Sequence, residues 1–408
     1  MEDPMSSTSN PPLRILLISH TCQSARLGQM KPHHIALAPD VELRVMVPDR
    51  WRDDYGNWRT ADEPLADNFH LEVARVRWPY LGPIKRYLHW YPDLGKVLRA
   101  FRPEIINIWE EQWGLVSAHA CWLRNRLLPE ARIICETEQN IEKKLPLPFE
   151  RFRRYSLRSA DFVVARNREA VQVVRNKGYQ GPVQVVGNSV DPEVFRPMDR
   201  HLCRKQLGLD GFVAGYVGRL VEEKGLMDLL DAATYLPDDV RVAFVGSGPM
   251  LDQLKARAAE LNLGPRAVFL AGRSLGELPP VMNALDALVL PSRTTPAWKE
   301  QFGRVIIEAH ACARPVIGSS SGAIPEVVGD GGLIFPERDA RQLAAAILAL
   351  KADPARAQAL GEIGRARVLD RYTWDKVGRQ MRDIYFEVAG RERRDQASAS
   401  EPGRLSLA

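Results

Sequence analysis

Long apolar runs are absent from this 408-residue chain, and no stretch approaches the roughly 18–20 apolar residues that a membrane-spanning helix requires. Cysteines are few, and the five present are scattered without a Cys-x-x-Cys pair. That spacing indicates neither a zinc site nor a disulfide framework, and it favours a reducing cytoplasm. Excess positive charge is also small. The net charge of +5 is too low to argue for a nucleic-acid partner.

Sequence patterns for metal binding are missing as well. The chain has no Asp-x-Asp triplet and no His-Glu-x-x-His motif, and among its eight histidines only His33 and His34 are neighbours. Metal sites in proteins need clustered ligands of these kinds. We therefore expect no metal site and no cofactor.

The composition is ordinary for a soluble globular protein, with 45% hydrophobic and 26% charged residues. At this length two domains are expected rather than one core. Residues 1–12 are acidic and small polar without an apolar core, unlike a secretory signal, and are predicted to be a disordered lead-in. Residues 390–408, low in large apolar side chains, are predicted to be a disordered tail.

Short apolar runs alternate with helical stretches, which predicts an α/β fold with parallel sheets. The first series of expected strands comprises Leu13–Ser19, Val41–Val47, Glu104–Trp109, Ala131–Cys135, Phe162–Ala165 and Val183–Val186. The second comprises Phe212–Val217, Val240–Val245, Ala267–Leu270, Ala287–Leu290, Pro315–Ile317 and Leu333–Phe335. We therefore predict two Rossmann-like domains, residues 13–190 and 200–372, with a linker at 191–199 and a closing helix at 373–388.

The most informative segment is Lys299–Glu326, which places Glu300 and Glu308 on either side of a Phe-Gly-Arg turn. The pattern puts Leu288–Pro291 on a buried strand and starts a helix near Gly303. Glu300 then lies in the loop after the strand, and Glu308 lies about one turn inside the helix. Free N–H groups at the start of a helix form a natural phosphate site. The two carboxylates could accept hydrogen bonds from a sugar on one side of that phosphate and a ribose on the other.

A second informative segment follows the first strand of the second domain. Gly218 there lets the backbone approach a ligand closely, and Arg219 and Lys224 supply positive charge where a diphosphate would lie. The spacing is not the Gly-x-Gly-x-x-Gly fingerprint of dinucleotide-binding folds. Taken alone, this segment is equally compatible with a solvated turn that carries two basic residues.

Together these segments resemble the family 4 retaining glycosyltransferases of the GT-B fold. The resemblance is carried by Pro291-Ser292, Glu300-Gln301-Phe302-Gly303 and Glu308-Ala309, and by Gly218-Arg219-Leu220 with Lys224-Gly225. It implies two Rossmann-like domains that face each other across a cleft, with the donor bound by the second. It further implies transfer of a sugar, with retention of configuration, from a nucleoside diphosphate sugar to a hydroxyl acceptor: a glycan, a lipid-linked saccharide or a small molecule.

The resemblance also assigns roles to residues. It makes Glu300, Arg219 and Lys224 catalytic. Its donor-binding residues would be Gly218, Arg219, Lys224, Arg273, Glu300, Phe302, Gly303, Arg304 and Glu308. Charge on the leaving phosphate would be stabilised by Arg219, Lys224 and the helix start at Gly303, so that no metal ion is required.

One departure concerns the first domain, where many family members carry a histidine that faces the reacting sugar. Here Ile133-Ile134-Cys135 runs instead into Glu136-Thr137-Glu138-Gln139-Asn140. Side chains at the carboxyl ends of strands are candidates for the acceptor site, namely Glu110, Glu111, Glu138 and Asn140. Nearby arginines could equally satisfy these glutamates.

Two other functions remain open. A nucleotide-sugar epimerase of the same architecture would need the same kind of ligand, and a non-catalytic sugar-nucleotide-binding protein would tolerate the missing histidine. The segment Phe149–Arg158 interleaves aromatic and basic residues, which is typical either of a helix at a membrane surface or of one packed on the core. We expect a cytoplasmic protein, and the first of these alternatives would add a peripheral contact at the inner membrane face.

Overall fold

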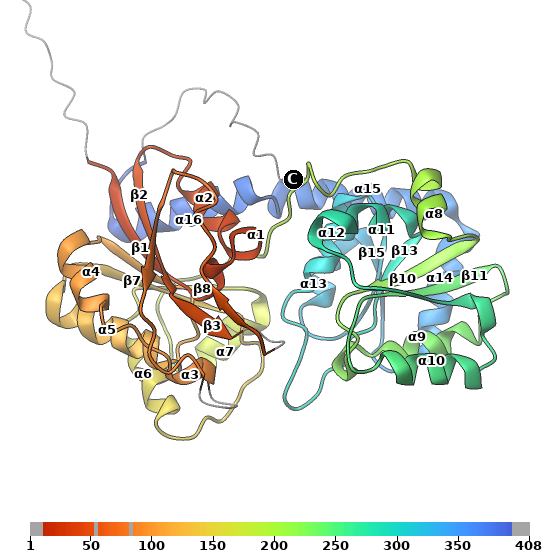
Figure 1. The fold of residues 1–408 in the computed structure, drawn as a ribbon, viewed down its shortest axis with the longest axis horizontal. Coiled ribbons are helices and arrows are strands. Elements are labelled where there is room, and N and C mark those ends of the chain that lie inside the picture. Colours follow the sequence, from red (N-terminus) through yellow and green to blue (C-terminus); the bar gives the residue numbers. More distant parts are fainter. Residues whose placement is uncertain (1–10, 53–55, 81–84, 394–408) are drawn as a thin grey trace, which may run out of the picture. The chain divides into compact units, whose positions relative to one another are not determined.

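The computed structural model describes residues 11–52, 56–80 and 85–393. The contacts between residues divide the chain into two compact units. Figure 1 shows the fold, coloured along the sequence. The first unit comprises residues 1–135, 159–162 and 378–408, and the second comprises residues 136–158 and 163–377. The predicted disordered ends, 1–12 and 390–408, lie largely outside the described residues. The predicted domain limits, 13–190 and 200–372, stay a prediction.

The first sheet has seven strands in the order β5-β2-β1-β6-β7-β8-β9. They are β1 (Leu13–Ile18), β2 (Val41–Pro48), β5 (His70–Ala74), β6 (Ile105–Ile108), β7 (Arg132–Thr137), β8 (Phe162–Ala165) and β9 (Val183–Val185). Strand β1 pairs in parallel with β2 and with β6. Every residue of β6 is buried, because helices cover both faces of a parallel sheet and favour apolar runs without alternation.

The helices between these strands are short. They are η1 (Thr21–Gln23), α1 (Ala25–Gly28), α2 (Met30–Ile35), α3 (Lys85–Leu88), α4 (Leu94–Phe101), α5 (Leu115–Leu127), α6 (Phe149–Ser159) and α7 (Arg168–Asn176). In α6, Phe149 and Leu157 are buried, whereas the exposed positions include Arg151, Arg154 and Arg158. Of the aromatic stripe of this helix, Phe149 is thus buried, and Phe152 and Tyr155 are half-buried.

Part of the chain between residues 49 and 96 forms strands that the apolar pattern did not predict. Strands β3 (Arg50–Arg52) and β4 (Trp58–Thr60) form a separate antiparallel pair, and β5 pairs in parallel with β2. All of β4 is exposed, and only the last residue of β5 is buried. Strands this short and this exposed carry no apolar run, and so the sequence did not reveal them.

The second sheet has six strands in the order β12-β11-β10-β13-β14-β15. They are β10 (Phe212–Val217), β11 (Val240–Val245), β12 (Ala267–Leu270), β13 (Ala287–Leu290), β14 (Val316–Ser319) and β15 (Gly332–Phe335), close to the expected bounds. All resolved pairs are parallel. This strand order is that of a doubly wound Rossmann-like fold, in which the direction of strand addition reverses beside the first strand.

Helices α9 and α10 lie on one face of the second sheet, and α11 and α12 on the other (Figure 1). The helices are α8 (Arg200–Leu207), η3 (Glu222–Lys224), α9 (Leu226–Ala233), α10 (Leu251–Glu260), η4 (Gly264–Arg266), η5 (Leu275–Glu277), α11 (Leu278–Ala284), α12 (Arg304–Ala311), α13 (Ile324–Val328), η6 (Gly329–Gly331), α14 (Ala340–Ala352) and α15 (Pro354–Arg371). Between them, the fully buried side chains of β10, β11 and β13 form the centre of the apolar core.

The last helix, α16 (Trp374–Ala389), contributes its C-terminal part to the first unit. A Cβ added at Gly378 would lie 2.7 Å from the carbonyl oxygen of His34, so only glycine allows this close approach. Arg382 donates a 2.9 Å hydrogen bond to the same carbonyl, and Arg391 donates a 3.1 Å hydrogen bond to Glu104. The first unit thus includes a stretch, residues 378–408, that lies far from the rest of it in the sequence.

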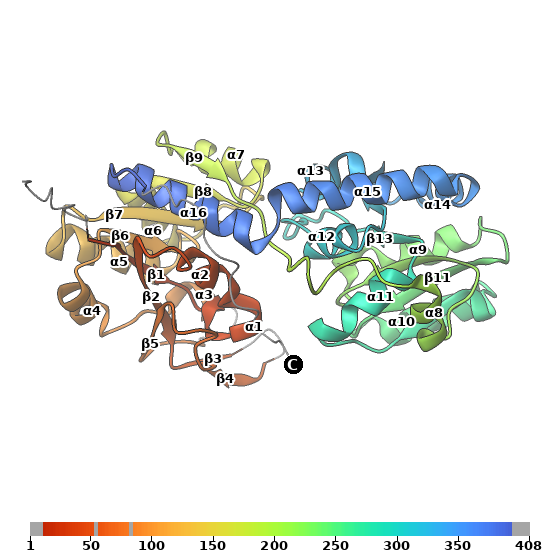
Figure 2. The ribbon, with the colours of Figure 1, turned by 90° about the horizontal axis from the view of Figure 1, so that it is seen from above.

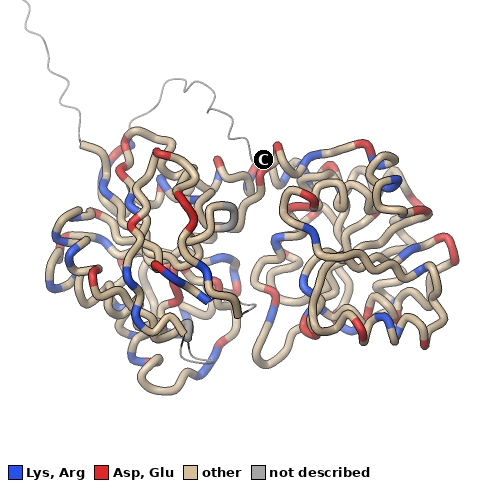
Figure 3. Tube along the Cα trace, viewed as in Figure 1, with Lys and Arg blue, Asp and Glu red and all other residues tan. Residues whose placement is uncertain are grey.

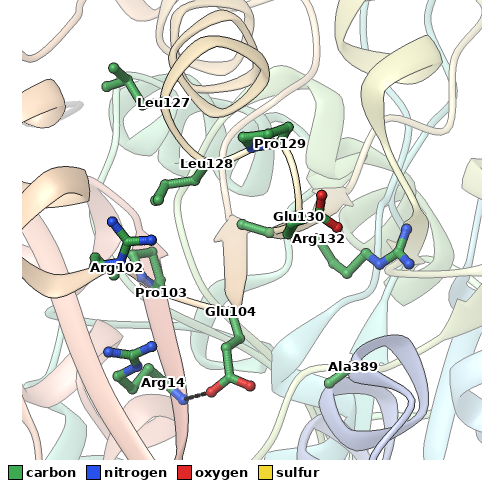
Figure 4. Close-up of a pocket in the computed structure, with 11 residues that line it drawn as sticks. Arg14, Arg102, Pro103, Glu104, Leu127, Leu128, Pro129, Glu130, Arg132 and Ala389 are labelled. Carbon is green, nitrogen blue, oxygen red and sulfur yellow. Dashed lines mark hydrogen bonds between the residues drawn. The ribbon is translucent and has the colours of Figure 1, made fainter.

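At the amino-terminal ends of β1, β6 and β7, a hollow of about 370 Å³ is lined by Arg14, Arg102, Glu104 and Arg132 among others (Figure 4). Parallel sheets bind ligands at the opposite, carboxyl edge. Basic and acidic residues are interspersed in both units, as Figure 3 shows. No helix of the described residues combines the length and hydropathy needed to cross a bilayer.

Helix α12 packs against α15 (Figure 2), and the fully buried side chain of His310 in α12 contacts α15. His310 Nε2 lies 3.1 Å from the carbonyl oxygen of Gly331, and a Cβ at Gly364 would meet the imidazole at 2.5 Å. The pKa of His310 falls from 6.5 to about 4, chiefly because of burial; the charge of Arg367 contributes to this shift, and the hydrogen bond to the Gly331 carbonyl opposes it. The imidazole is therefore neutral in the folded protein at neutral pH.

We predict that His310 makes the second unit less stable as the pH falls from 6.5 towards 4. In that window the unfolded chain binds a proton that the folded chain excludes, so the free energy of unfolding decreases by up to about 3 kcal/mol. Urea unfolding of His310→Gln should show a shallower pH dependence than the wild type. The exposed His70→Gln is the control, and equal slopes in all three proteins would contradict the prediction.

Candidate functional site

Two loops meet at the carboxyl edge of the second sheet, where the strand order reverses between β10 and β13. The loop after β10 contains Gly225, whose added Cβ would lie 2.0 Å from the carbonyl oxygen of Pro291. In the loop after β13, Arg293 N–H donates a 2.8 Å hydrogen bond to the carbonyl of Glu223. Such a reversal point is where open α/β sheets bind ligands.

Lys224 and Glu300 join these loops. Lys224 Nζ donates a 2.6 Å hydrogen bond to Glu300 Oε2, which also accepts a 2.9 Å hydrogen bond from Ser292 Oγ. The side chains of Lys224 and Glu300 are 16% and 8% exposed, so water screens the pair only weakly. The structure therefore brings together two residues that the sequence placed 76 positions apart and assigned to one site.

The backbone of Glu300 is also fixed. Its carbonyl accepts a 3.0 Å hydrogen bond from Ala323 N–H and a 2.8 Å hydrogen bond from Asn140 Nδ2, all within the second unit. Asn140 is buried, and no hydrogen-bond partner of its Oδ1 is found in the described part of the chain. The structure thus places Asn140 against the backbone beside the paired glutamates.

Helix α12 starts directly after Gly303. Gly303 has φ of 76°, a left-handed conformation that strains other residues, and a Cβ there would lie 2.9 Å from Ile306 Cδ1. The glycine therefore allows the sharp entry that separates Glu300 from the helix. Glu308 lies inside the helix and is buried, and burial raises the pKa of its carboxyl group while the nearby charge of Arg304 opposes this shift.

The other predicted donor residues occupy different surroundings. Gly218 follows β10 with φ of 150°, and the side chain of Arg219 after it is exposed. Arg273 follows the edge strand β12 and lies 3.6 Å from Glu277. Phe302 is buried with its ring edge-on to Tyr372, at a centroid distance of 5.6 Å. Their roles in donor binding stay predictions, as does that of half-buried Arg304.

In the first sheet the strand order reverses between β1 and β6, and Glu110 follows β6. Its carboxylate accepts hydrogen bonds from the backbone N–H of His20 at 2.6 Å and lies 2.7 Å from His20 Nδ1. Burial raises the pKa of Glu110, but the charge and hydrogen bonds of His20 outweigh burial and lower it. His20 in turn stacks on Trp51, with ring centroids 4.6 Å apart.

An arginine partners Glu136, near the carboxyl end of β7, and Glu138, just after that strand. Buried Arg166 donates a 3.1 Å hydrogen bond to Glu138, lies 3.6 Å from Glu136, and donates to the carbonyls of Val186 and Gly187. The structure thus favours the alternative in which arginine satisfies these glutamates. Glu111 is half-buried, and its carbonyl accepts a 2.9 Å hydrogen bond from Ser117 Oγ.

Sequence reasoning missed several residues that support these loops. His20 could have been found, because it follows the first strand at a reversal point of the sheet. Two buried or partly buried anchors had no local signal: Asp228 pairs with Arg293, and Glu337 accepts a 2.7 Å hydrogen bond from Thr294 Oγ1. Across the described residues, no group of three His, Cys, Asp or Glu side chains could hold a metal ion.

Comparisons with known proteins find similarity to glycosyltransferases. The model of the family described as glycosyl transferases group 1 matches residues 199–367. The chain is 35% identical over 260 residues to the D-inositol 3-phosphate glycosyltransferase of Mycobacterium marinum, covering 59% of this chain and 54% of the relative. It is 35% identical over 221 residues to the GDP-mannose-dependent alpha-(1-6)-phosphatidylinositol monomannoside mannosyltransferase of Mycolicibacterium smegmatis, covering 51% and 56%. The chain spans about half the length of these curated relatives.

Among solved structures, sucrose-phosphate synthase from Thermosynechococcus elongatus is similar over 93% of this chain and 99% of its own, with a TM-score of 0.70. Its sequence identity of 23% makes this a likeness of fold. The predicted α/β architecture with two Rossmann-like sheets is thereby confirmed. Residues 199–367 thus match the glycosyl transferases group 1 family, and the fold of the chain is GT-B.

Proposed function

We propose that this chain is a glycosyltransferase that moves a sugar from a nucleoside diphosphate sugar to a hydroxyl acceptor with retention of configuration. The observation that carries the proposal is the Lys224–Glu300 pair at the reversal point of the second sheet, with Glu300 eight positions before buried Glu308 in the chain. Both residues lie within the matched family segment. The name of one relative states dependence on GDP-mannose, which supports a nucleotide-sugar donor.

The proposed chemistry needs positive charge at the departing phosphate. Breaking the bond between the sugar and the diphosphate builds negative charge on the leaving oxygen. Lys224, Arg219 and the backbone N–H groups at the start of α12 would stabilise that charge without a metal ion. Glu300 would then accept hydrogen bonds from sugar hydroxyls, and Glu308 from the ribose.

The acceptor is proposed to bind at the carboxyl edge of the first sheet, where Glu110 and His20 lie. Retention is proposed from the resemblance of the paired-glutamate segment to retaining enzymes. The five cysteines are free and buried, which fits a proposed cytoplasmic location, including the membrane surface if the acceptor is lipid-linked.

The test is to purify the chain and measure its thermal unfolding with UDP, GDP, ADP and their sugars, followed by release of sugar from the donor that binds best. A ligand that binds only the folded state raises the unfolding temperature. Binding with donor cleavage supports the proposal, and cleavage should be lost in Glu300→Gln. Binding without cleavage would favour a binding protein, and exchange of sugar hydrogen with solvent without an acceptor would indicate an epimerase.

We predict that Glu308→Ala and Glu300→Ala affect different steps. Loss of the ribose contact in Glu308→Ala should weaken nucleoside diphosphate binding by about 10- to 100-fold, because hydrogen bonds to a charged group contribute about 1.5–3 kcal/mol. Glu300→Ala should mainly lower the turnover number. Calorimetric titration and initial rates measure both effects, with exposed Glu362→Ala as the control. Unchanged nucleotide affinity in Glu308→Ala would refute the ribose contact.

We also predict that full activity survives excess chelator, because Lys224, Arg219 and the start of α12 already supply the charge that a divalent cation would bring. Initial rates should agree within about twofold with EDTA and with added magnesium or manganese, a difference of less than about 0.5 kcal/mol in the barrier. A rate that EDTA abolishes and magnesium restores would show that these groups are insufficient.

A further inference from the structure

Lys224 has a second partner besides Glu300. Its ammonium group lies over the ring of Trp298, with Nζ 4.7 Å from the ring centroid. The indole is half-buried and belongs to the same loop as Glu300, two positions before it. The ammonium is therefore held between a carboxylate and an aromatic face that one loop presents together.

A compact turn fixes Trp298. Thr295 N–H donates a 2.8 Å hydrogen bond to the carbonyl of Trp298, and Thr295 Oγ1 accepts hydrogen bonds from the N–H groups of Trp298 and Ala297 at 3.0 and 3.3 Å. These bonds close the turn upon itself. The backbone position of Trp298 is thus set by hydrogen bonds within the turn.

The residues before this turn are anchored to the body of the domain. Arg293 Nε donates a 2.7 Å hydrogen bond to Asp228, which is 3% exposed. Thr294 Oγ1 donates a 2.7 Å hydrogen bond to Glu337, and the backbone N–H of Thr294 donates to the other oxygen of that carboxylate. The loop that carries Trp298 is therefore tied to the body of the domain through Arg293 and Thr294.

The two partners of Lys224 would behave differently when donor binds. Glu300 would exchange its hydrogen bond to Lys224 for sugar hydroxyls, and the ammonium would turn to the diphosphate. A lysine side chain that loses its only fixed partner regains rotamer freedom, which opposes binding. An aromatic face attracts a cation without competing for the anion that the cation binds, because the attraction comes from the ring quadrupole.

We propose that Trp298 is a positioning residue for the donor diphosphate, acting through Lys224: its ring holds the ammonium group in place while the diphosphate replaces Glu300 as the partner of that group. The inference rests on the proposed function, because it takes the diphosphate of the donor as the ligand of Lys224. It assigns to Trp298 no contact with the reacting atoms.

The test is a double-mutant cycle on ligand binding. The probes are the diphosphate that binds best among UDP, GDP and ADP, and the nucleoside with the same base, both titrated calorimetrically. Trp298→Leu should weaken binding of the diphosphate by about 3- to 10-fold, as expected for a partly desolvated cation–π contact. It should change the affinity for the nucleoside by less than about twofold. Trp298→Phe, which keeps an aromatic face, should recover most of the loss.

The background Lys224→Met decides whether Trp298 acts through the lysine. In that background Trp298→Leu should change diphosphate affinity by less than twofold, since the residue it positions is gone. The inference would be overturned if Trp298→Leu lowered diphosphate affinity equally in the wild type and in Lys224→Met. It would also be overturned if the substitution lowered the affinities for diphosphate and nucleoside equally. Trp122→Leu, at an exposed tryptophan of the first unit, is the control.

Two further results separate the possible failures. If Trp298→Leu lowers the unfolding temperature, Thr295→Val serves as the second variant, because it loosens the turn without removing the ring. The loss of diphosphate affinity in Thr295→Val should likewise disappear in the Lys224→Met background. If the unsubstituted chain binds none of the three diphosphates, the proposed function fails and the inference with it. Binding by the unsubstituted chain without coupling between Trp298 and Lys224 refutes the inference alone.

Discussion

The hydrogen-bonded ion pair between Lys224 and Glu300 is the constraint on which the candidate site depends. Both charges are largely withdrawn from water, so removing either partner would leave the other poorly solvated, at a cost of about 3–5 kcal/mol for a fully buried pair. The loops must therefore bring the two groups together accurately. The anchors at Asp228 and Glu337, the turn at Thr295 and the left-handed Gly303 all serve this placement.

Most of the fold could be predicted from the sequence because fully buried parallel strands read as uninterrupted apolar runs. Strands β10, β11, β12 and β13 coincide with their expected bounds. The edge strand β5 and the β3–β4 pair were missed, since half-exposed or exposed strands of three to five residues carry too little apolar periodicity. The length and burial of a strand thus decided whether it could be predicted from the sequence.

The candidate site was predictable where its chemistry lies in short segments and not where it depends on distant partners. The spacing from Glu300 to Glu308 and the basic residues after β10 were readable, and the structure joins Lys224 to Glu300. The partners of Glu110 and Glu138 come from segments 90 and 28 positions away, and their pairing is set by the order of strands in the sheet. No local pattern in the sequence contains that order, so the partners of these two carboxylates could be identified only from the structure.

The return of α16 to the first unit has a consequence for how the chain is made. The packing of Gly378 against His34 and the bond from Arg391 to Glu104 join segments that are almost the whole chain apart, 287 positions in the second case. During synthesis the second unit can reach its native contacts while the first still lacks part of its surface. The amino-terminal sheet is therefore exposed to misassociation until α16 leaves the ribosome, although its strands are made first.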